Sequence, residues 1–359
     1  MTIRAFGGPH RYIQGPGALN ELAALVPLYG RRPFVVADVA VSGLRDQLTA
    51  LLQPYVDGLE FAEFSGECSA SQIDAMAAKA GAANSDVVIA IGGGKAIDTA
   101  KGVRILRGGA IIVLPTVASN DAPTSRLAIV YTDDHVLKEV RLMPTNPDAV
   151  VVDTSIIARA PRRFFVAGIG DALSKKFEAE QCFNSGGMNF YKARPAALAV
   201  SIADQCYQVI RRDAVASLKA ADRKEPDAAF ENIVEATILL SGLGFESGGL
   251  SIAHSLTRGF SAVPSLNASL HGEQVAFGLL TQLCLEQRPA DFLADMVAFY
   301  RSVGLPTSLK ELGFSGDLRE GILTIAQRSI AEAPYLKQFV GAVTEENLVA
   351  ALRSADSLR

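Results

Sequence analysis

The chain has 359 residues, 49% of them hydrophobic, which is enough to bury a large core and to form two or more domains. Charged residues make up 20% of the chain and leave a formal net charge of −4, without a concentration of basic side chains. A surface that follows nucleic acid phosphates needs such a concentration, so nucleic acid is excluded as the main partner.

The first thirty residues hold short apolar pieces interrupted by Arg4, His10 and Arg11, which does not match a secretion signal. Apolar runs further along have the length of strands, so no membrane span is expected. The four cysteines are far apart in the sequence, which indicates neither a zinc knuckle nor a disulfide framework. We therefore expect a cytoplasmic protein that does not contact a membrane.

From about residue 30 to residue 155, short β-branched runs alternate with helical patterns. This alternation is typical of parallel strands joined by crossover helices. The expected strands are residues 33–38, 59–64, 86–92, 110–115, 127–131 and 149–153. Residues 1–154 are therefore predicted to form an α/β domain with a mostly parallel sheet.

A glycine-rich turn follows the third of these strands. The segment 91–98 reads IGGGKAID and comes directly before a helix that should run to about residue 103. Three glycines allow a tight turn and a close approach of backbone to ligand, and the helix start offers free amide groups to a diphosphate. The string lacks the six-position glycine fingerprint, so a plain strand-to-helix turn with a solvated Lys95 remains an alternative.

Two further features favour a nucleotide at the carboxyl ends of these strands. Asp38 ends the strand 33–38, where its carboxylate can accept hydrogen bonds from an adenosine ribose and would repel a 2′-phosphate. This favours NAD over NADP, although Asp38 could instead cap the next turn. The loop 115–123 is rich in hydroxyls and turn formers and lies at the expected ligand-binding edge.

After about residue 154 the strand pattern is replaced by long segments with helical apolar periodicity. These segments are residues 193–211, 228–245, 270–287 and 290–303. Residues 155–359 are therefore predicted to form an all-helical domain, which begins where the last strand gives way to a capped helix start.

Two of the four histidines, His254 and His271, lie in apolar helical surroundings, where an unpaired imidazole is costly to bury. A single such histidine is usually a hydrogen-bonded core residue. Asp171 adds a carboxylate in the glycine-rich segment 168–173, GIGDAL. Two imidazoles and one carboxylate would make a three-ligand site with an open position, as in catalytic zinc sites. The spacing of the three residues does not by itself establish that site.

Five segments together resemble the glycerol dehydrogenases, a family within the group III, iron-containing-type alcohol dehydrogenases. They are residues 92–98, 116–121, 168–173, 246–250 and 270–278. The segments occur in the family's order and span nearly the whole chain. The resemblance implies a dehydroquinate synthase-like fold, with an NAD-binding α/β domain followed by a helical metal-binding and catalytic domain.

The resemblance also assigns residues. It implies that Asp171, His254 and His271 bind Zn²⁺ and that Asp121, together with the metal, holds the polyol substrate. It implies NAD binding by a larger set of residues: Asp38, Gly93, Gly94, Lys95, Asp98, Thr116, Ser119, Ser125, Leu127 and Tyr131. It further implies a homo-oligomer, with an octamer among the candidate sizes.

The chain departs from the family at two positions. Iron-type members carry a histidine four residues after the aspartate ligand, where this chain has Lys175, and this favours zinc over iron. Many glycerol dehydrogenases carry a second histidine where this chain has Thr257, followed by Arg258. Arg258 either grips a substrate carboxylate in a bidentate manner or points to the helix surface.

The sequence thus predicts an oxidoreductase that transfers a hydride from glycerol or another vicinal diol to NAD⁺, giving a hydroxyketone such as dihydroxyacetone. One alternative is an NAD-dependent hydroxy acid or other alcohol dehydrogenase of the same family. A dehydroquinate synthase-like lyase would need more basic residues than Lys175, Lys176 and Arg258 near the metal. A non-catalytic NAD-binding protein is the last alternative, against which the intact ligand trio argues.

Overall fold

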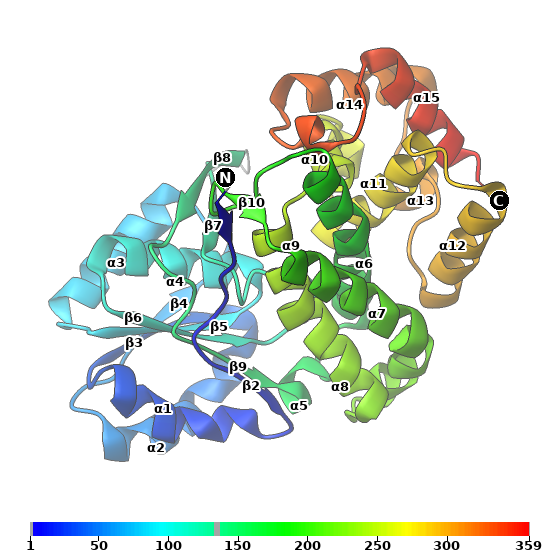
Figure 1. Cartoon of the computed structure of the whole chain (residues 1–359). Helices are drawn as coiled ribbons and strands as arrows, with labels where there is room; N and C mark the ends of the chain where they lie inside the picture. The colour runs from blue at the N-terminus through cyan, green and yellow to red at the C-terminus, as the bar shows by residue number, and fades with distance from the viewer. Residues whose placement is uncertain (1–2, 133–136, 359) are drawn as a thin grey trace. The chain divides into compact units, whose positions relative to one another are not determined.

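The computed structural model describes residues 3–132 and 137–358 (Figure 1). The chain forms two compact units. The nucleotide unit consists of Gly8–Ala160 and Arg223–Asp227, and the helical unit consists of Met1–Gly7, Pro161–Asp222 and Ala228–Arg359. The change from one to the other after Ala160 lies shortly beyond the expected boundary at residue 154, and the described residues up to Gly7 belong to the helical unit.

A parallel sheet forms the centre of the nucleotide unit, in the order β2-β9-β6-β5-β3-β4 among the described residues. Its strands are β2 (Tyr12–Gly15), β3 (Pro33–Asp38), β4 (Glu60–Phe64), β5 (Val87–Gly92), β6 (Ala110–Pro115) and β9 (Ala149–Asp153). The helices are α1 (Leu22–Tyr29), α2 (Arg45–Leu52), α3 (Ala70–Ala82), α4 (Gly94–Arg107) and α5 (Thr154–Ile157). Figure 1 shows α1 and α2 on one face of the sheet and α3 and α4 on the other. With both faces covered, β5 and β9 are buried along their whole length, which explains their continuous apolar sequence.

In the nucleotide unit, the predicted strand 127–131 belongs to a different sheet, and two strands were not predicted. Residues 127–131 do form a strand, β7 (Leu127–Tyr131), but it pairs antiparallel with β8 (Leu137–Leu142) outside the parallel sheet. Strand β8 carries mostly exposed and charged side chains, so it lacks the apolar run that would have revealed it. Strand β2 is a short edge strand beside β9, and none of its residues is fully buried.

The helical unit contains the long helices α6 and α7 and eight shorter ones among the described residues. They are α6 (Arg162–Asn184), α7 (Ala197–Arg223), α8 (Ala228–Glu235), α9 (Ser241–Gly248), α10 (Ile252–Phe260), α11 (His271–Leu285), α12 (Ala290–Val303), α13 (Leu309–Leu312), α14 (Leu318–Glu332) and α15 (Glu345–Asp356). The prediction of an all-helical second half needs one correction, because β1 (Arg4–Ala5) pairs in parallel with β10 (Arg194–Pro195). Pro195 cannot continue a helix, so the helix expected from residue 193 begins only at Ala197.

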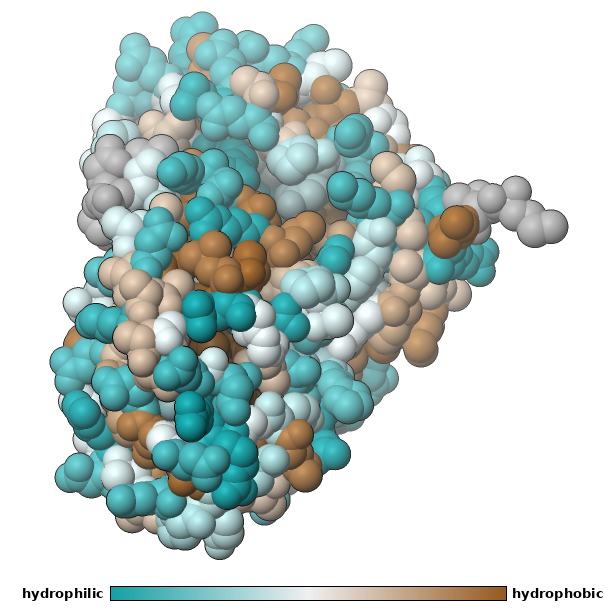
Figure 2. Space-filling view, turned by 90° about the vertical axis from the view of Figure 1, so that its left-hand side faces the viewer, coloured by the Kyte–Doolittle hydropathy of each residue, from teal (hydrophilic) through white to brown (hydrophobic). Residues whose placement is uncertain are grey.

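One stretch of the described residues, Ala228–Gly248, is long and apolar enough to cross a membrane by length and composition alone. Of its most apolar window, 56% is buried within the protein, as in the core helix of a soluble protein. On the face drawn in Figure 2, hydrophilic residues surround smaller groups of hydrophobic ones.

Candidate functional site

Two glycines bring helices α6 and α11 into direct backbone contact. A Cβ atom at Gly170 would lie 2.7 Å from the carbonyl oxygen of Gly272, and a Cβ atom at Gly272 would lie 1.8 Å from that of Ala167. Neither position can therefore hold a side chain without pushing the helices apart. Asp171 directly follows the first glycine and His271 directly precedes the second, so the close crossing places these two side chains together.

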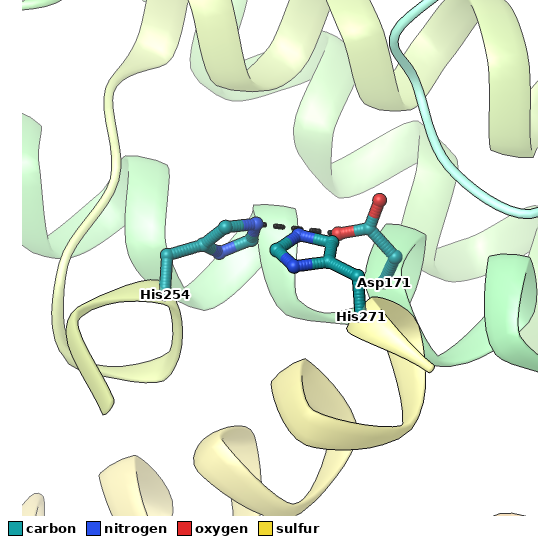
Figure 3. Close-up of side chains that lie close together, drawn as sticks. All are labelled: Asp171, His254 and His271. Atoms are coloured by element: carbon teal, nitrogen blue, oxygen red, sulfur yellow. Dashed lines mark ion pairs between the residues drawn. The ribbon is translucent and has the colours of Figure 1, made fainter. Parts of the chain in front are cut away.

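Asp171, His254 and His271 form a compact group of potential metal ligands (Figure 3). One ligand atom from each residue lies within 4.8 Å of the others. Nε2 of His254, on α10, is 3.2 Å from Oδ1 of Asp171, and the two imidazole ring centroids are 5.4 Å apart. Asp171 is buried, whereas His271 is exposed, so the group is closed on one side and open on the other.

Lys175 extends into this group. Its side chain is only 1% exposed, and its Nζ lies 2.6 Å from Oδ1 of Asp171 and 3.0 Å from Nε2 of His254. The other carboxylate oxygen of Asp171, Oδ2, is buried and has no hydrogen-bond partner within residues 3–132 and 137–358. The Lys175 ammonium thus occupies two of the ligand atoms, while Oδ2 of Asp171 is left as an acceptor without a partner among the described residues.

The protonation states of Asp171 and His271 suit a cation. Burial alone would raise the pKa of Asp171, but the Lys175 ammonium and the neighbouring imidazoles of His254 and His271 hold that pKa well below its usual range. Solvent reaches part of His271, yet loss of hydration within the protein lowers its pKa to about 4. At pH 7 the carboxylate is therefore charged and the His271 imidazole is neutral, as ligands of a metal ion must be.

A residue that the sequence analysis did not single out, Glu178, supports His254. Its Oε2 atom lies 2.5 Å from Nδ1 of His254 and accepts a hydrogen bond from Oγ of Ser174. Glu178 follows Asp171 by about two helical turns and so shares its face of α6. This spacing was the available signal, but it does not distinguish a buried carboxylate from a solvated one.

In the nucleotide unit, the glycine-rich turn joins the ends of β3 and β5 to the start of α4. Gly92 has φ +150°, and a Cβ atom there would lie 2.8 Å from those of both Asp38 and Ala96. A Cβ atom at Gly94 would lie 3.0 Å from Nδ2 of Asn120. The N-cap of α4 is Gly93, which offers no side-chain cap, so the first amide groups of the helix are left for another acceptor.

Several residues predicted to bind NAD line the same edge of the sheet. Thr116 is buried and donates its amide to the carbonyl oxygen of Gly92 at 3.0 Å, and Ser119 follows it in the loop after β6. Asp38 accepts a hydrogen bond from the amide of Ala40 at 2.9 Å, which is the turn-capping alternative. Lys95 is exposed and pairs with Glu67. Asp121, proposed for the substrate, is buried in the same loop as Ser119.

Lys101, which was not predicted from the sequence, forms hydrogen bonds with three of the residues that were predicted to bind NAD. Its fully buried Nζ donates to Oδ1 of Asp98 at 3.2 Å, to Oγ of Ser125 at 3.3 Å and to the carbonyl oxygen of Leu127 at 2.6 Å. The second oxygen of Asp98 accepts the amide of Ile129 at 3.0 Å. These hydrogen bonds tie α4 to β7. Tyr131 lies apart from them and donates its amide to Cys68 at 2.8 Å.

Comparison with known proteins agrees with the resemblance seen in the sequence. A family model described as iron-containing alcohol dehydrogenase matches residues 9–154. A glycerol dehydrogenase of Escherichia coli O6:H1 is 37% identical over 98% of this chain and 96% of that protein. The crystal structure of a probable glycerol dehydrogenase from Sinorhizobium meliloti 1021 has a TM-score of 0.92 and 40% identity, covering 99% of both chains.

The crystal structure of glycerol dehydrogenase from Schizosaccharomyces pombe has a TM-score of 0.95 and 31% identity, covering 100% of this chain and 91% of that one. These matches extend over both units, so they confirm the predicted fold class of a parallel α/β part followed by a helix-rich part. The chain therefore belongs to the iron-containing alcohol dehydrogenase family.

Proposed function

We propose that this dehydrogenase oxidises glycerol or a related vicinal diol with NAD⁺ and uses one Zn²⁺ held by Asp171, His254 and His271. The observation that carries the metal assignment is the convergence of three donor atoms within 4.8 Å around a buried carboxylate whose Oδ2 has no hydrogen-bond partner among the described residues. One carboxylate and two imidazoles fit the donor preferences of Zn²⁺ and leave a position for substrate.

When bound, Zn²⁺ supplies Lewis-acid chemistry that lowers the pKa of a substrate hydroxyl. The chain's own residues would balance the charge of the metal and orient the substrate. The buried charge of Asp171 would balance the cation, and His271, which solvent reaches, would mark the side from which substrate enters. Asp121 is proposed to hydrogen-bond a neighbouring hydroxyl, which would favour diols over simple alcohols.

The proposed NAD contacts fall into two groups. The amides that follow Gly93 and Gly94 would bind the pyrophosphate, while Asp38 would accept hydrogen bonds from the ribose with its remaining lone pairs. Both oxygens of Asp98 are already engaged, so its proposed part is to hold α4 and β7 in place. We further propose a cytoplasmic homo-oligomer, on the strength of the resemblance alone.

A hydroxy acid is the second candidate substrate, and Arg258 favours it. Arg258 lies one helical turn after His254 on α10, so both side chains share a face of that helix. Within the described part of the chain, no carboxylate forms an ion pair with Arg258. An unpaired guanidinium beside the metal ligands could bind the carboxylate of a 2-hydroxy acid.

A substrate panel separates the candidates. NADH formation is followed with glycerol, 1,2-propanediol, a simple alcohol and several 2-hydroxy acids, using metal-stripped protein with and without added Zn²⁺. We expect diols to be oxidised only after zinc is restored. Activity restricted to hydroxy acids would replace the polyol assignment, and tight NAD binding without any turnover would contradict both.

A further inference from the structure

Glu178 is a fully buried carboxylate with a hydrogen-bond partner on every side. Its side chain is 0% exposed. Oε1 accepts the backbone amides of Ser251 at 2.9 Å and His254 at 3.0 Å. Oε2 accepts Oγ of Ser174 at 3.0 Å and lies 2.5 Å from Nδ1 of His254. Burying a charge is costly, so a carboxylate held this way is expected to have a defined task.

The task of Oε1 is to cap a helix. Helix α10 begins at Ile252, and its N-cap residue, Ser251, provides no side-chain cap. Glu178 satisfies two amides of this helix start from a different helix, and its negative charge faces the positive end of the helix dipole. The first turn of α10, which carries His254, is thereby fixed to α6.

The task of Oε2 concerns the imidazole itself. An ionised carboxylate accepts hydrogen bonds but cannot donate them, so the proton of His254 must lie on Nδ1. Nε2 then carries the lone pair. The Lys175 ammonium, which can only donate, lies 3.0 Å from Nε2, closer than Oδ1 of Asp171 at 3.2 Å, and this also favours a lone pair on Nε2.

We propose that Glu178 is a positioning residue of the metal site, which fixes the tautomer and orientation of His254 so that Nε2 faces the ligand group. The proposal rests on the metal function proposed above. In metal sites, a carboxylate often accepts a hydrogen bond from the second ring nitrogen of a metal-binding histidine. Loss of such a carboxylate typically weakens metal binding by about 10- to 100-fold.

The Glu178→Gln variant separates this role from simple capping. The glutamine carbonyl can still accept the two backbone amides, so the start of α10 is retained. Its NH₂ group faces Nδ1 of His254 and Oγ of Ser174, both of which can accept. The amide therefore moves the histidine proton to Nε2, which removes the lone pair that a metal ion needs.

The first measurement uses the metal-free, full-length chain with ¹⁵N-labelled histidine. Long-range ¹H–¹⁵N spectra report which nitrogen of each of the four imidazoles carries the proton. We expect His254 to be protonated on Nδ1 in the wild type and on Nε2 in the Glu178→Gln variant. A wild-type His254 protonated on Nε2 overturns the proposal without any variant.

The second measurement is the Zn²⁺ affinity of each protein, by competition with a chelator. We expect Glu178→Gln to bind about 10- to 100-fold more weakly than wild type, with little change in the thermal unfolding midpoint of the metal-free protein. Glu180→Gln is the matched control, because Glu180 lies on the same helix, is 31% exposed and pairs with Lys176. Equal affinity of wild type and Glu178→Gln refutes the proposal. A wild type that binds no zinc refutes the metal function, while the spectra still test the tautomer.

Discussion

The ammonium of Lys175 lies 2.6 Å from Oδ1 of Asp171, inside the group of residues assigned to the metal. The same ammonium is 3.0 Å from Nε2 of His254. A divalent cation between these ligands would lie in contact with the positively charged ammonium. The repulsion between the two cations would cost on the order of several kcal/mol at low dielectric, about as much as a buried ion pair contributes. Metal binding must therefore displace Lys175 from the two ligand atoms.

The Lys175→Met variant should lose stability chiefly in the metal-free state. Removing one partner of a buried ion pair typically costs about 3–5 kcal/mol, because the Asp171 charge is left uncompensated. With Zn²⁺ bound, the metal compensates that charge and the loss should be smaller. By linkage, zinc affinity should rise more than tenfold, since about 1.4 kcal/mol corresponds to tenfold.

Urea unfolding with chelator and with excess Zn²⁺ measures the two losses. Lys176→Met is the matched control, because the neighbouring lysine pairs with Glu180 and Asp204 at a partly exposed position. Exposed pairs contribute about 1 kcal/mol or less, and the control should lose that in both states. An equal loss in both states for Lys175→Met would contradict the displacement.

The Gly272→Ala variant should disrupt the metal group through the backbone. The new methyl group would lie 1.8 Å from the carbonyl oxygen of Ala167, so α6 and α11 must separate. Overpacking of this kind costs about 1–3 kcal/mol or more and would move His271 away from Asp171. Thermal unfolding and zinc titration should both show the loss. Gly58→Ala serves as control, since a Cβ atom there has its nearest contact at 3.9 Å.

The Asp38→Ser variant should weaken discrimination between NAD⁺ and NADP⁺. A serine can still cap the turn by accepting the amide of Ala40, but it cannot repel a 2′-phosphate. We expect KM for NAD⁺ to rise by about tenfold, because a charge-assisted hydrogen bond is worth about 1.5–3 kcal/mol, while KM for NADP⁺ falls. Steady-state kinetics with both cofactors measures the ratio. An unchanged ratio would mean that Asp38 only caps the turn.

The Arg258→Leu variant distinguishes the two candidate substrates. Under the polyol assignment, kcat/KM for glycerol should change little, because a neutral diol makes no ion pair with a guanidinium. Under the hydroxy acid alternative, kcat/KM should fall by about 10- to 100-fold, as expected for the loss of a charge-assisted bidentate contact. Arg258→Lys is the companion variant, because it keeps the charge but loses the planar pair of donors.

The sequence predicted those parts of the fold whose apolar pattern reflects burial. Strands β5 and β9 are buried on both faces and stand out as apolar runs, whereas β8 is largely exposed and charged and was missed. The convergence of Asp171, His254 and His271 was predicted only with the help of the family resemblance. Their distances along the chain carry no information about the α6–α11 crossing that brings Asp171 and His271 together.

Buried charges were the main features that the sequence could not predict. Lys101 and Glu178 are both 0% exposed, yet each lies in a helix where charged residues usually face water. Lys175 was noted because it replaces a histidine of iron-type relatives and is one of the few basic residues near the predicted metal site. Its place beside the ligand atoms depends on the packing of α6 and α10, which no local pattern specifies.

The central claim is that a metal ion held by Asp171, His254 and His271 is needed for diol oxidation. Its most direct test measures bound zinc and NADH formation from glycerol, on the same samples, for wild type, His271→Ala and the control His10→Ala, whose histidine belongs to the nucleotide unit. We predict one zinc per chain and turnover in wild type and His10→Ala, and loss of both in His271→Ala. Full glycerol oxidation by a His271→Ala protein, or by wild-type protein shown to contain no metal, would contradict the claim.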